Sequence, residues 1–109
     1  MIRASAVALF VLGTAAAVQA DNVVEAELSY EIFDFYSPTE LLRDGTIRVT
    51  ARNLATGQTF TADERSGNSF TLPVGTYTFT GRSQWCFLAA STLEIEAETT
   101  DISLYAGCE

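Results

Sequence analysis

The sequence predicts an all-β fold, a seven-stranded antiparallel β-sandwich that follows a cleaved signal peptide. From residue 24 onward, apolar residues alternate with polar residues in seven short runs. This is the period of a strand with one buried and one solvated face. Turn-forming residues such as Asp44-Gly45 and Ser66-Gly67-Asn68 separate the runs, and no segment after residue 20 sustains a helical period. Short strands at this spacing are typical of two antiparallel sheets packed face to face.

Residues 1–20 have the pattern of a secretory signal peptide. Arg3 supplies a positive charge, and residues 4–18 are apolar or small and uncharged. This run is shorter than the roughly 20 residues of a membrane-spanning helix and fits the apolar region of a signal peptide. Val18-Gln19-Ala20 has small residues at the positions that signal peptidase requires. We therefore expect cleavage between Ala20 and Asp21 and one periplasmic or secreted domain over 21–109; an uncleaved membrane anchor is the alternative.

The expected strands follow in chain order from their period-2 alternation. In the first, Val24, Ala26 and Leu28 face one way and the glutamates between them face the other. Between the first two runs, residues 37–42 are expected to form one helical turn at most. Threonine recurs in the later runs, as its β-branched side chain favours. The seven runs cover residues 24–32, 46–52, 59–62, 69–72, 76–80, 93–98 and 102–106.

Cys86 and Cys108 are the only cysteines. Export would place them in an oxidising compartment, so we expect a structural disulfide between them. A domain of this size buries only about 60–65% of its unfolded surface and is marginally stable alone. A disulfide that closes a loop of about 22 residues contributes on the order of 3 kcal/mol. Intermolecular pairing is the main alternative, since the spacing fits neither a redox nor a metal motif.

The composition excludes several classes of function. The chain has no histidine and no lysine, and its net charge is −8. Catalysis by Ser-His-Asp or Cys-His groups, Schiff-base chemistry and a Walker-type phosphate loop all need one of the missing residues. An acidic chain is also repelled by nucleic acid. We therefore expect no enzyme activity, no cofactor, no nucleic-acid partner and no membrane insertion after signal cleavage.

Two rows of carboxylates invite a different interpretation. Each row occupies alternate positions of one expected strand, and a separation of roughly 6–7 Å between neighbours is compatible with glycosidase chemistry. Calcium binding is a further alternative, although the loops lack the spacing of a calcium loop. Glutamates on a solvated strand face more commonly provide solubility and protect sheet edges. We therefore expect no catalytic or metal site in these rows, which comprise Glu25, Glu27 and Glu31, and Glu94, Glu96 and Glu98.

The best candidate for a partner contact is the aromatic segment of Phe33, Phe35 and Tyr36. Strand alternation cannot bury all three of these side chains on one face. Exposed aromatic residues are favoured anchors for binding partners. The alternative is a hydrophobic plug over the core. Trp85, beside Cys86, is expected to pack in the core against the disulfide, with ligand stacking as its alternative.

Residues 45–79 carry a more specific pattern. Ile47 and Val49 form a Val-x-Val-type strand, Thr56-Gly57 a turn, and residues 70–77 the pattern Phe-x-Leu-x-x-Gly-x-Tyr. This stretch resembles the carboxypeptidase regulatory-like and collagen-binding B-type repeats. The resemblance implies a prealbumin-like, Ig-like sandwich of seven strands. It also implies an accessory, adhesive or structural role without catalysis.

The chain differs from these repeats and related proteins in two respects, and each difference restricts the function expected of it. Repeats of this kind are often stapled by a Lys–Asn isopeptide bond, which a chain without lysine cannot form. The related transthyretin-like hydrolases use histidine, which is absent. We therefore expect an exported, non-enzymatic module that binds or scaffolds a protein, a wall polymer or a glycan. The alternative is a small periplasmic inhibitor or immunity-like protein that blocks a hydrolase with an acidic loop.

Overall fold

The computed structural model describes residues 23–42 and 45–109, so the expected signal peptide and the Ala20–Asp21 cleavage site lie outside the described residues. The all-β prediction is confirmed, and the described residues form nine strands rather than seven. Within the described ranges, no helix is long and apolar enough to cross a membrane. The strands are β1 (Glu25–Asp34), β2 (Ser37–Leu41), β3 (Arg48–Asn53), β4 (Thr59–Ala62), β5 (Ser69–Pro73), β6 (Gly75–Arg82), β7 (Cys86–Leu88), β8 (Ser91–Ile95) and β9 (Asp101–Cys108), with one short 3-10 turn, η2 (Glu64–Ser66).

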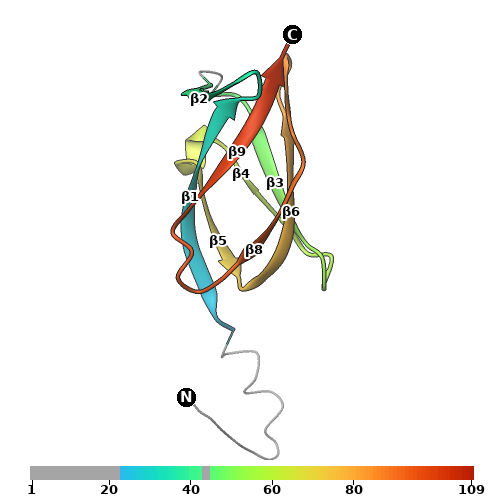
Figure 1. The fold of residues 1–109 in the computed structure, drawn as a ribbon. Helices are drawn as coiled ribbons and strands as arrows, with labels where there is room; N and C mark the ends of the chain where they lie inside the picture. The colour runs from blue at the N-terminus through green and yellow to red at the C-terminus, as the bar shows by residue number, and fades with distance from the viewer. Residues whose placement is uncertain (1–22, 43–44) are drawn as a thin grey trace, which may run out of the picture.

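The strands fold over into two layers (Figure 1). One layer has the antiparallel order β4-β3-β6-β8. In the other layer β1 pairs with β5, β9 and β2. Short β7 pairs with both β6 and β9 and so joins the layers near the upper end in Figure 1. The result is an unclosed sandwich with its core between the layers.

Alternation along the strands builds the core. In β1, Ala26, Leu28 and Tyr30 are buried while the residues between them are exposed. From the opposite layer, Tyr77 and Phe79 of β6 are fully buried. Burying such side chains supplies most of the stabilisation of a small domain. The core residues are Ala26, Leu28, Tyr30, Ile47, Val49, Ala51, Ala62, Phe70, Leu72, Tyr77, Phe79, Cys86, Leu88, Ile95, Leu104 and Ala106.

One pairing differs from the antiparallel expectation, because β1 and β9 run parallel. Their register joins Ser29 to Asp101 and Asp34 to Ala106. Both strands start at the lower end of the molecule and finish at the upper end (Figure 1). A parallel pair needs a long connection between its strands, which the rest of the domain provides.

Residues 37–42, for which one helical turn at most was expected, contain the strand β2 over residues 37–41. The N–H of Tyr36 donates to the Asp34 carboxylate (2.8 Å), which stabilises a tight turn after β1. Leu41 then pairs with Phe33, across an irregularity in the register. Pro38 is tolerated because β2 lies at the end of the sheet order.

The strand expected over residues 93–98 is too long, since β8 ends at Ile95. The N–H of Glu96 donates to the Thr99 hydroxyl (2.9 Å), and the N–H of Thr99 donates to the Glu96 carbonyl (3.0 Å). These local hydrogen bonds form a turn in place of further pairing. Glu96 and Glu98 therefore lie in a turn rather than on a strand face.

The expected disulfide is present. Cys86 of β7 and Cys108 of β9 lie directly opposite each other, with their Cα atoms 4.0 Å apart. Cys86 is buried and Cys108 is exposed. The bond therefore ties β7, a strand of three residues, to the much longer β9.

We predict that the variant Cys86→Ala/Cys108→Ala loses about 3 kcal/mol of unfolding free energy, because its unfolded chain is no longer constrained by a loop. Urea denaturation of the wild type and the variant measures the loss. A reductant should destabilise the wild type to a similar extent and leave the variant unchanged. Equal stability of the two proteins, or two reactive thiols in denatured unreduced wild type, would contradict the disulfide.

Candidate functional site: an aromatic groove

The outer face of β1, β9 and β7 carries aromatic side chains at its upper end. Leu104 and Ala106 of β9 are buried, so the intervening Tyr105 and the following Gly107 face outward. Tyr105 pairs with Phe33 of β1, and Gly107 pairs with Phe87 of β7. The pairing therefore places these outward positions in neighbouring rows across three strands.

Phe35 and Tyr36 extend this face through the turn between β1 and β2. The N–H of Phe35 donates to the Ala106 carbonyl (2.8 Å), which holds the turn against the end of β9. Phe35 is 54% exposed and Tyr36 is 79% exposed. Their ring centroids are 5.4 Å apart in an edge-to-face arrangement, a favourable geometry for two aromatic rings.

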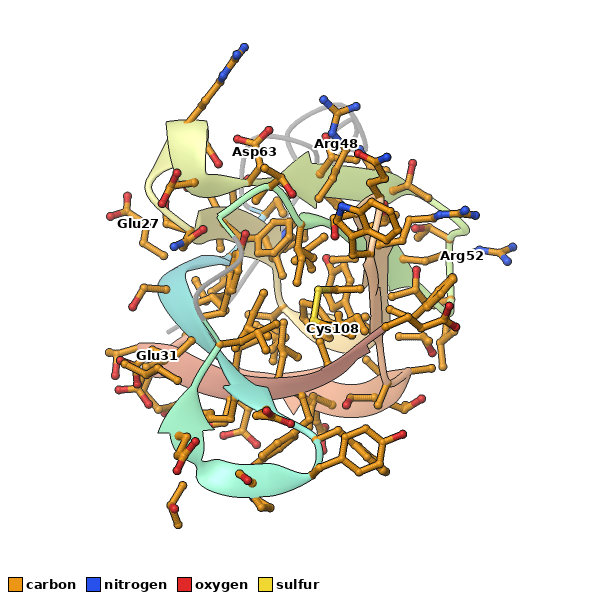
Figure 2. The ribbon with its side chains drawn as sticks, turned by 90° about the horizontal axis from the view of Figure 1, so that it is seen from above. Glu27, Glu31, Arg48, Arg52, Asp63 and Cys108 are labelled. Carbon is orange, nitrogen blue, oxygen red and sulfur yellow. A yellow bond between two sulfur atoms is a disulfide. The ribbon has the colours of Figure 1, made fainter. Side chains whose placement is uncertain are left out.

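A groove of about 290 Å³ lies between these rings and Phe87. Gly107 contributes to its lining, because a Cβ atom there would lie 3.4 Å from the ring of Tyr36. Phe87 is 52% exposed, and the guanidinium of Arg82 lies 5.5 Å from its ring centroid. Figure 2 looks down on this end and shows the Cys108 disulfide. We call this feature the aromatic groove; it is lined by Phe35, Tyr36, Phe87, Leu88, Ala89, Gly107, Cys108 and Glu109.

The structure separates the three residues predicted to contact a partner. Phe35 and Tyr36 are exposed and line the groove. Phe33 is half-buried, with its ring 5.9 Å from that of Tyr105, and does not line the groove. Phe87 also lines the groove and was not predicted from the sequence. The only indication in the sequence is that Cys86 and Leu88, the residues on either side of Phe87, have side chains suited to burial. This run is too short to predict a strand.

The prediction that Trp85 packs in the core is wrong, since its side chain is 61% exposed. Trp85 lies in the loop before β7, and Cys86 takes the first inward position of that strand. The N–H of Cys86 donates to the hydroxyl of Ser83 (3.1 Å), and the N–H of Glu109 donates to the Trp85 carbonyl (2.8 Å). These hydrogen bonds fix the loop through its backbone and leave the indole outside the core.

The glutamates of the two expected rows lie on solvated surfaces. Glu25, Glu27 and Glu31 are exposed along β1, and Glu94 is exposed on β8. Within the described residues, no group of three acidic, cysteine or histidine side chains could hold a metal ion. Asp63 instead accepts backbone hydrogen bonds at the start of η2 and lies 4.0 Å from the guanidinium of Arg48 (Figure 2).

The surroundings of the buried Tyr30 side chain disfavour ionisation of its hydroxyl. Its side chain is 3% exposed, and its hydroxyl has no hydrogen-bond partner among the described residues. Burial, followed by the negative charge of Asp63, raises the pKa of Tyr30 from 10.0 to about 12. Both effects disfavour the tyrosinate in the folded protein.

We predict that Tyr30 makes the fold sensitive to alkali. Because the pKa is higher in the folded than in the unfolded state, the stabilisation is complete below pH 10 and is lost as the pH rises towards 12. Between pH 9 and 11 the wild type should lose roughly 1 kcal/mol more unfolding free energy than Tyr30→Phe. Urea denaturation of both proteins across this range measures the difference. Parallel pH profiles would contradict the raised pKa.

Comparison with known proteins identifies no relative. No family model, curated protein or solved structure matches the chain. The resemblance of residues 45–79 to carboxypeptidase regulatory-like and collagen-binding B-type repeats therefore stays a prediction, and evidence on function comes from the composition and from the geometry of the groove.

Proposed function

We propose that this protein is an exported, non-enzymatic β-sandwich module that binds or scaffolds a partner in the cell envelope or extracellular space. The contact surface is the aromatic groove. The observation that carries the proposal is the gathering of Phe35, Tyr36 and Phe87, each more than half exposed, around one groove. Clustered exposed apolar side chains indicate a binding surface more often than isolated ones do.

The groove is held in shape before any partner arrives. One wall, Phe35 and Tyr36, is fixed by backbone hydrogen bonds to Ala106 and Asp34. The other wall, Phe87, follows Cys86, which is bonded to Cys108. A surface that is already ordered loses less conformational entropy on binding. Aromatic side chains have few rotatable bonds and therefore favour tight contacts for the same reason.

Compartment and composition support a binding role over catalysis. A cysteine pair joined by a disulfide is compatible with the periplasm or the extracellular space. Without histidine and lysine, the chain lacks imidazole bases and lysine amine nucleophiles. Its net charge of −8 disfavours nucleic acid as the partner. The classes of partner that remain are a protein, a wall polymer and a glycan. Aromatic rings can form contacts with each of these.

We predict that Phe35→Ala/Tyr36→Ala/Phe87→Ala reduces partner recovery at least tenfold. Each truncation removes exposed apolar area at the expected centre of the contact. Recovery is measured by pull-down from envelope extract and by co-sedimentation with insoluble wall polymer. The matched control is Leu54→Ala/Val74→Ala, which removes exposed apolar side chains from turns at the opposite end of the sandwich.

A second variant tests the groove without removing its aromatic walls. Gly107→Val should fill the space beside Tyr36 and lower recovery, while valine remains favourable in a strand. Unchanged recovery by both groove variants, or equal loss by the control, would overturn the aromatic groove as the contact. The inhibitor alternative requires stoichiometric loss of activity in a panel of lysozymes and proteases, with the groove variants unable to inhibit.

A further inference from the structure

The layer of β4, β3, β6 and β8 presents one continuous polar face on its outer side. Its inward side chains, such as Val49 and Phe79, are buried in the core, so the alternate side chains point outward. Every outward position of these strands holds threonine or arginine, except Glu94 near the end of β8. We call this the threonine–arginine face; it comprises the outward residues of Arg48–Asn53, Thr59–Ala62, Gly75–Arg82 and Ser91–Ile95.

The strand register places the threonines of this face side by side. Thr61 of β4 pairs with Thr50 of β3, and Thr50 pairs with Thr80 of β6. In the next row, Thr78 pairs with Thr92 of β8, and a hydrogen bond of 3.0 Å joins their hydroxyl oxygens. Neighbouring strands lie about 4.8 Å apart, so the hydroxyls form rows across the layer. Each hydroxyl can both donate and accept hydrogen bonds.

Three exposed arginines lie among these threonines. Arg48 of β3 and Arg82 of β6 are directly opposite each other. Arg52 is on the same side of β3 as Arg48 and about 13 Å further along the strand. Like charges directly opposite each other in a sheet are destabilising, and a bound anion would offset that cost.

Internal carboxylates do little to neutralise these arginines. The one ion pair among the described residues joins Arg48 to Asp63, with N and O atoms 4.0 Å apart, and an exposed pair of this kind contributes little free energy. The guanidinium of Arg82 lies 5.5 Å from the ring centroid of Phe87. Within residues 23–42 and 45–109, no carboxylate forms an ion pair with Arg52 or Arg82. Their guanidinium groups can therefore bind an anion from outside the chain.

The acidic side chains of β1 lie on the other layer. Seen from above, Arg48 and Arg52 project on one side of the molecule, and Glu27 and Glu31 lie on the other (Figure 2). Packed layers are about 10 Å apart, and exposed charges separated by more than about 8 Å are largely screened at physiological ionic strength. The net charge of −8 therefore does not decide which ligands this face attracts.

We propose that the threonine–arginine face binds a uronate polysaccharide, a polymer whose sugars carry carboxylate groups. The carboxylates pair with Arg48, Arg52 and Arg82, and the sugar hydroxyls exchange hydrogen bonds with the threonine rows. An acidic protein would match the arginines only, because the outward positions of this face offer none of the apolar anchors on which protein contacts depend. The face shares no residue with the aromatic groove, and the proposal does not depend on the function proposed for the groove.

The test is isothermal titration calorimetry of the full chain with four polymers. Polygalacturonate and alginate carry both carboxylates and sugar hydroxyls. Dextran carries the hydroxyls alone, and polyglutamate carries carboxylates on a peptide chain. Both uronate polymers should bind saturably, dextran should not bind, and polyglutamate should bind at least tenfold more weakly than polygalacturonate.

A first pair of variants tests the role of the arginines. Arg52→Gln should weaken binding of polygalacturonate at least fivefold, because it removes a charge from the centre of the face. Arg65→Gln is the matched control, since it removes the same charge from η2 and should leave the affinity unchanged. Urea denaturation of each variant reports whether it is folded.

A second pair of variants tests the hydroxyl rows without changing the charge. Thr50→Val/Thr80→Val keeps side-chain shape and favours strands, and it should weaken binding of polygalacturonate several-fold. The matched control is Thr39→Val/Thr71→Val, which removes exposed hydroxyls from β2 and β5 and should have no effect.

Three results would overturn the proposal. The first is no saturable binding of either uronate polymer. The second is equal weakening by a variant and its matched control, or binding of polyglutamate as tight as that of polygalacturonate, which would indicate an acidic protein as the partner. The third is self-association of the wild type without polymer that Arg52→Gln abolishes, because the occupant of the face would then be a second copy of the chain.

Discussion

The change of partners along β1 is the constraint on which the rest of the fold depends. Its first half pairs with β5, whereas its second half pairs with β9 on one edge and β2 on the other. Because β9 also pairs with β7, and β7 with β6, β1 is linked to the other layer through β9 and β7. Displacing β1 would therefore disturb both sheets and expose Ala26, Leu28 and Tyr30 of the core.

The same change of partners produces a cavity beside Tyr30 and positions the aromatic turn. The β5-to-β2 exchange opens the cavity beside Tyr30, and the end of β1 beyond Phe33 carries the aromatic turn. Tyr30 faces the core, whereas Phe35 is exposed and lines the aromatic groove with Phe87. One strand thus offers chemically different surfaces, one acidic and one aromatic, because alternation and pairing present its residues to different surroundings.

The sequence predicted the fold class and most of the core, because period-2 alternation marks half-buried strands directly. Prediction from the sequence failed where contacts between distant parts of the chain determine the structure. Residues 37–41 have no local pattern of a strand, and they form one because they pair with β1. Trp85 is typical of a core residue, but Cys86 occupies the inward position of β7 and Trp85 is exposed. The exposure of aromatic side chains in the segment of residues 33–36 could be predicted, because alternation cannot bury Phe33, Phe35 and Tyr36 on one face. Phe87 and the Tyr30 cavity could not, because each depends on strands distant in the sequence.

The disulfide constrains the unfolded chain by closing a loop, and it also has a structural role in the folded domain. β7 has three residues and pairs with β6 at only one position, Arg82 with Phe87. β7 is therefore held to the rest of the domain mainly by β9, with which all three of its residues pair. The Cys86–Cys108 bond fixes β7 to β9, the strand that carries Gly107 beside Tyr36. Without the bond, β7 would be held to β9 by backbone pairing alone. The stability of this end of the sandwich and the shape of the groove thus depend on the same covalent link.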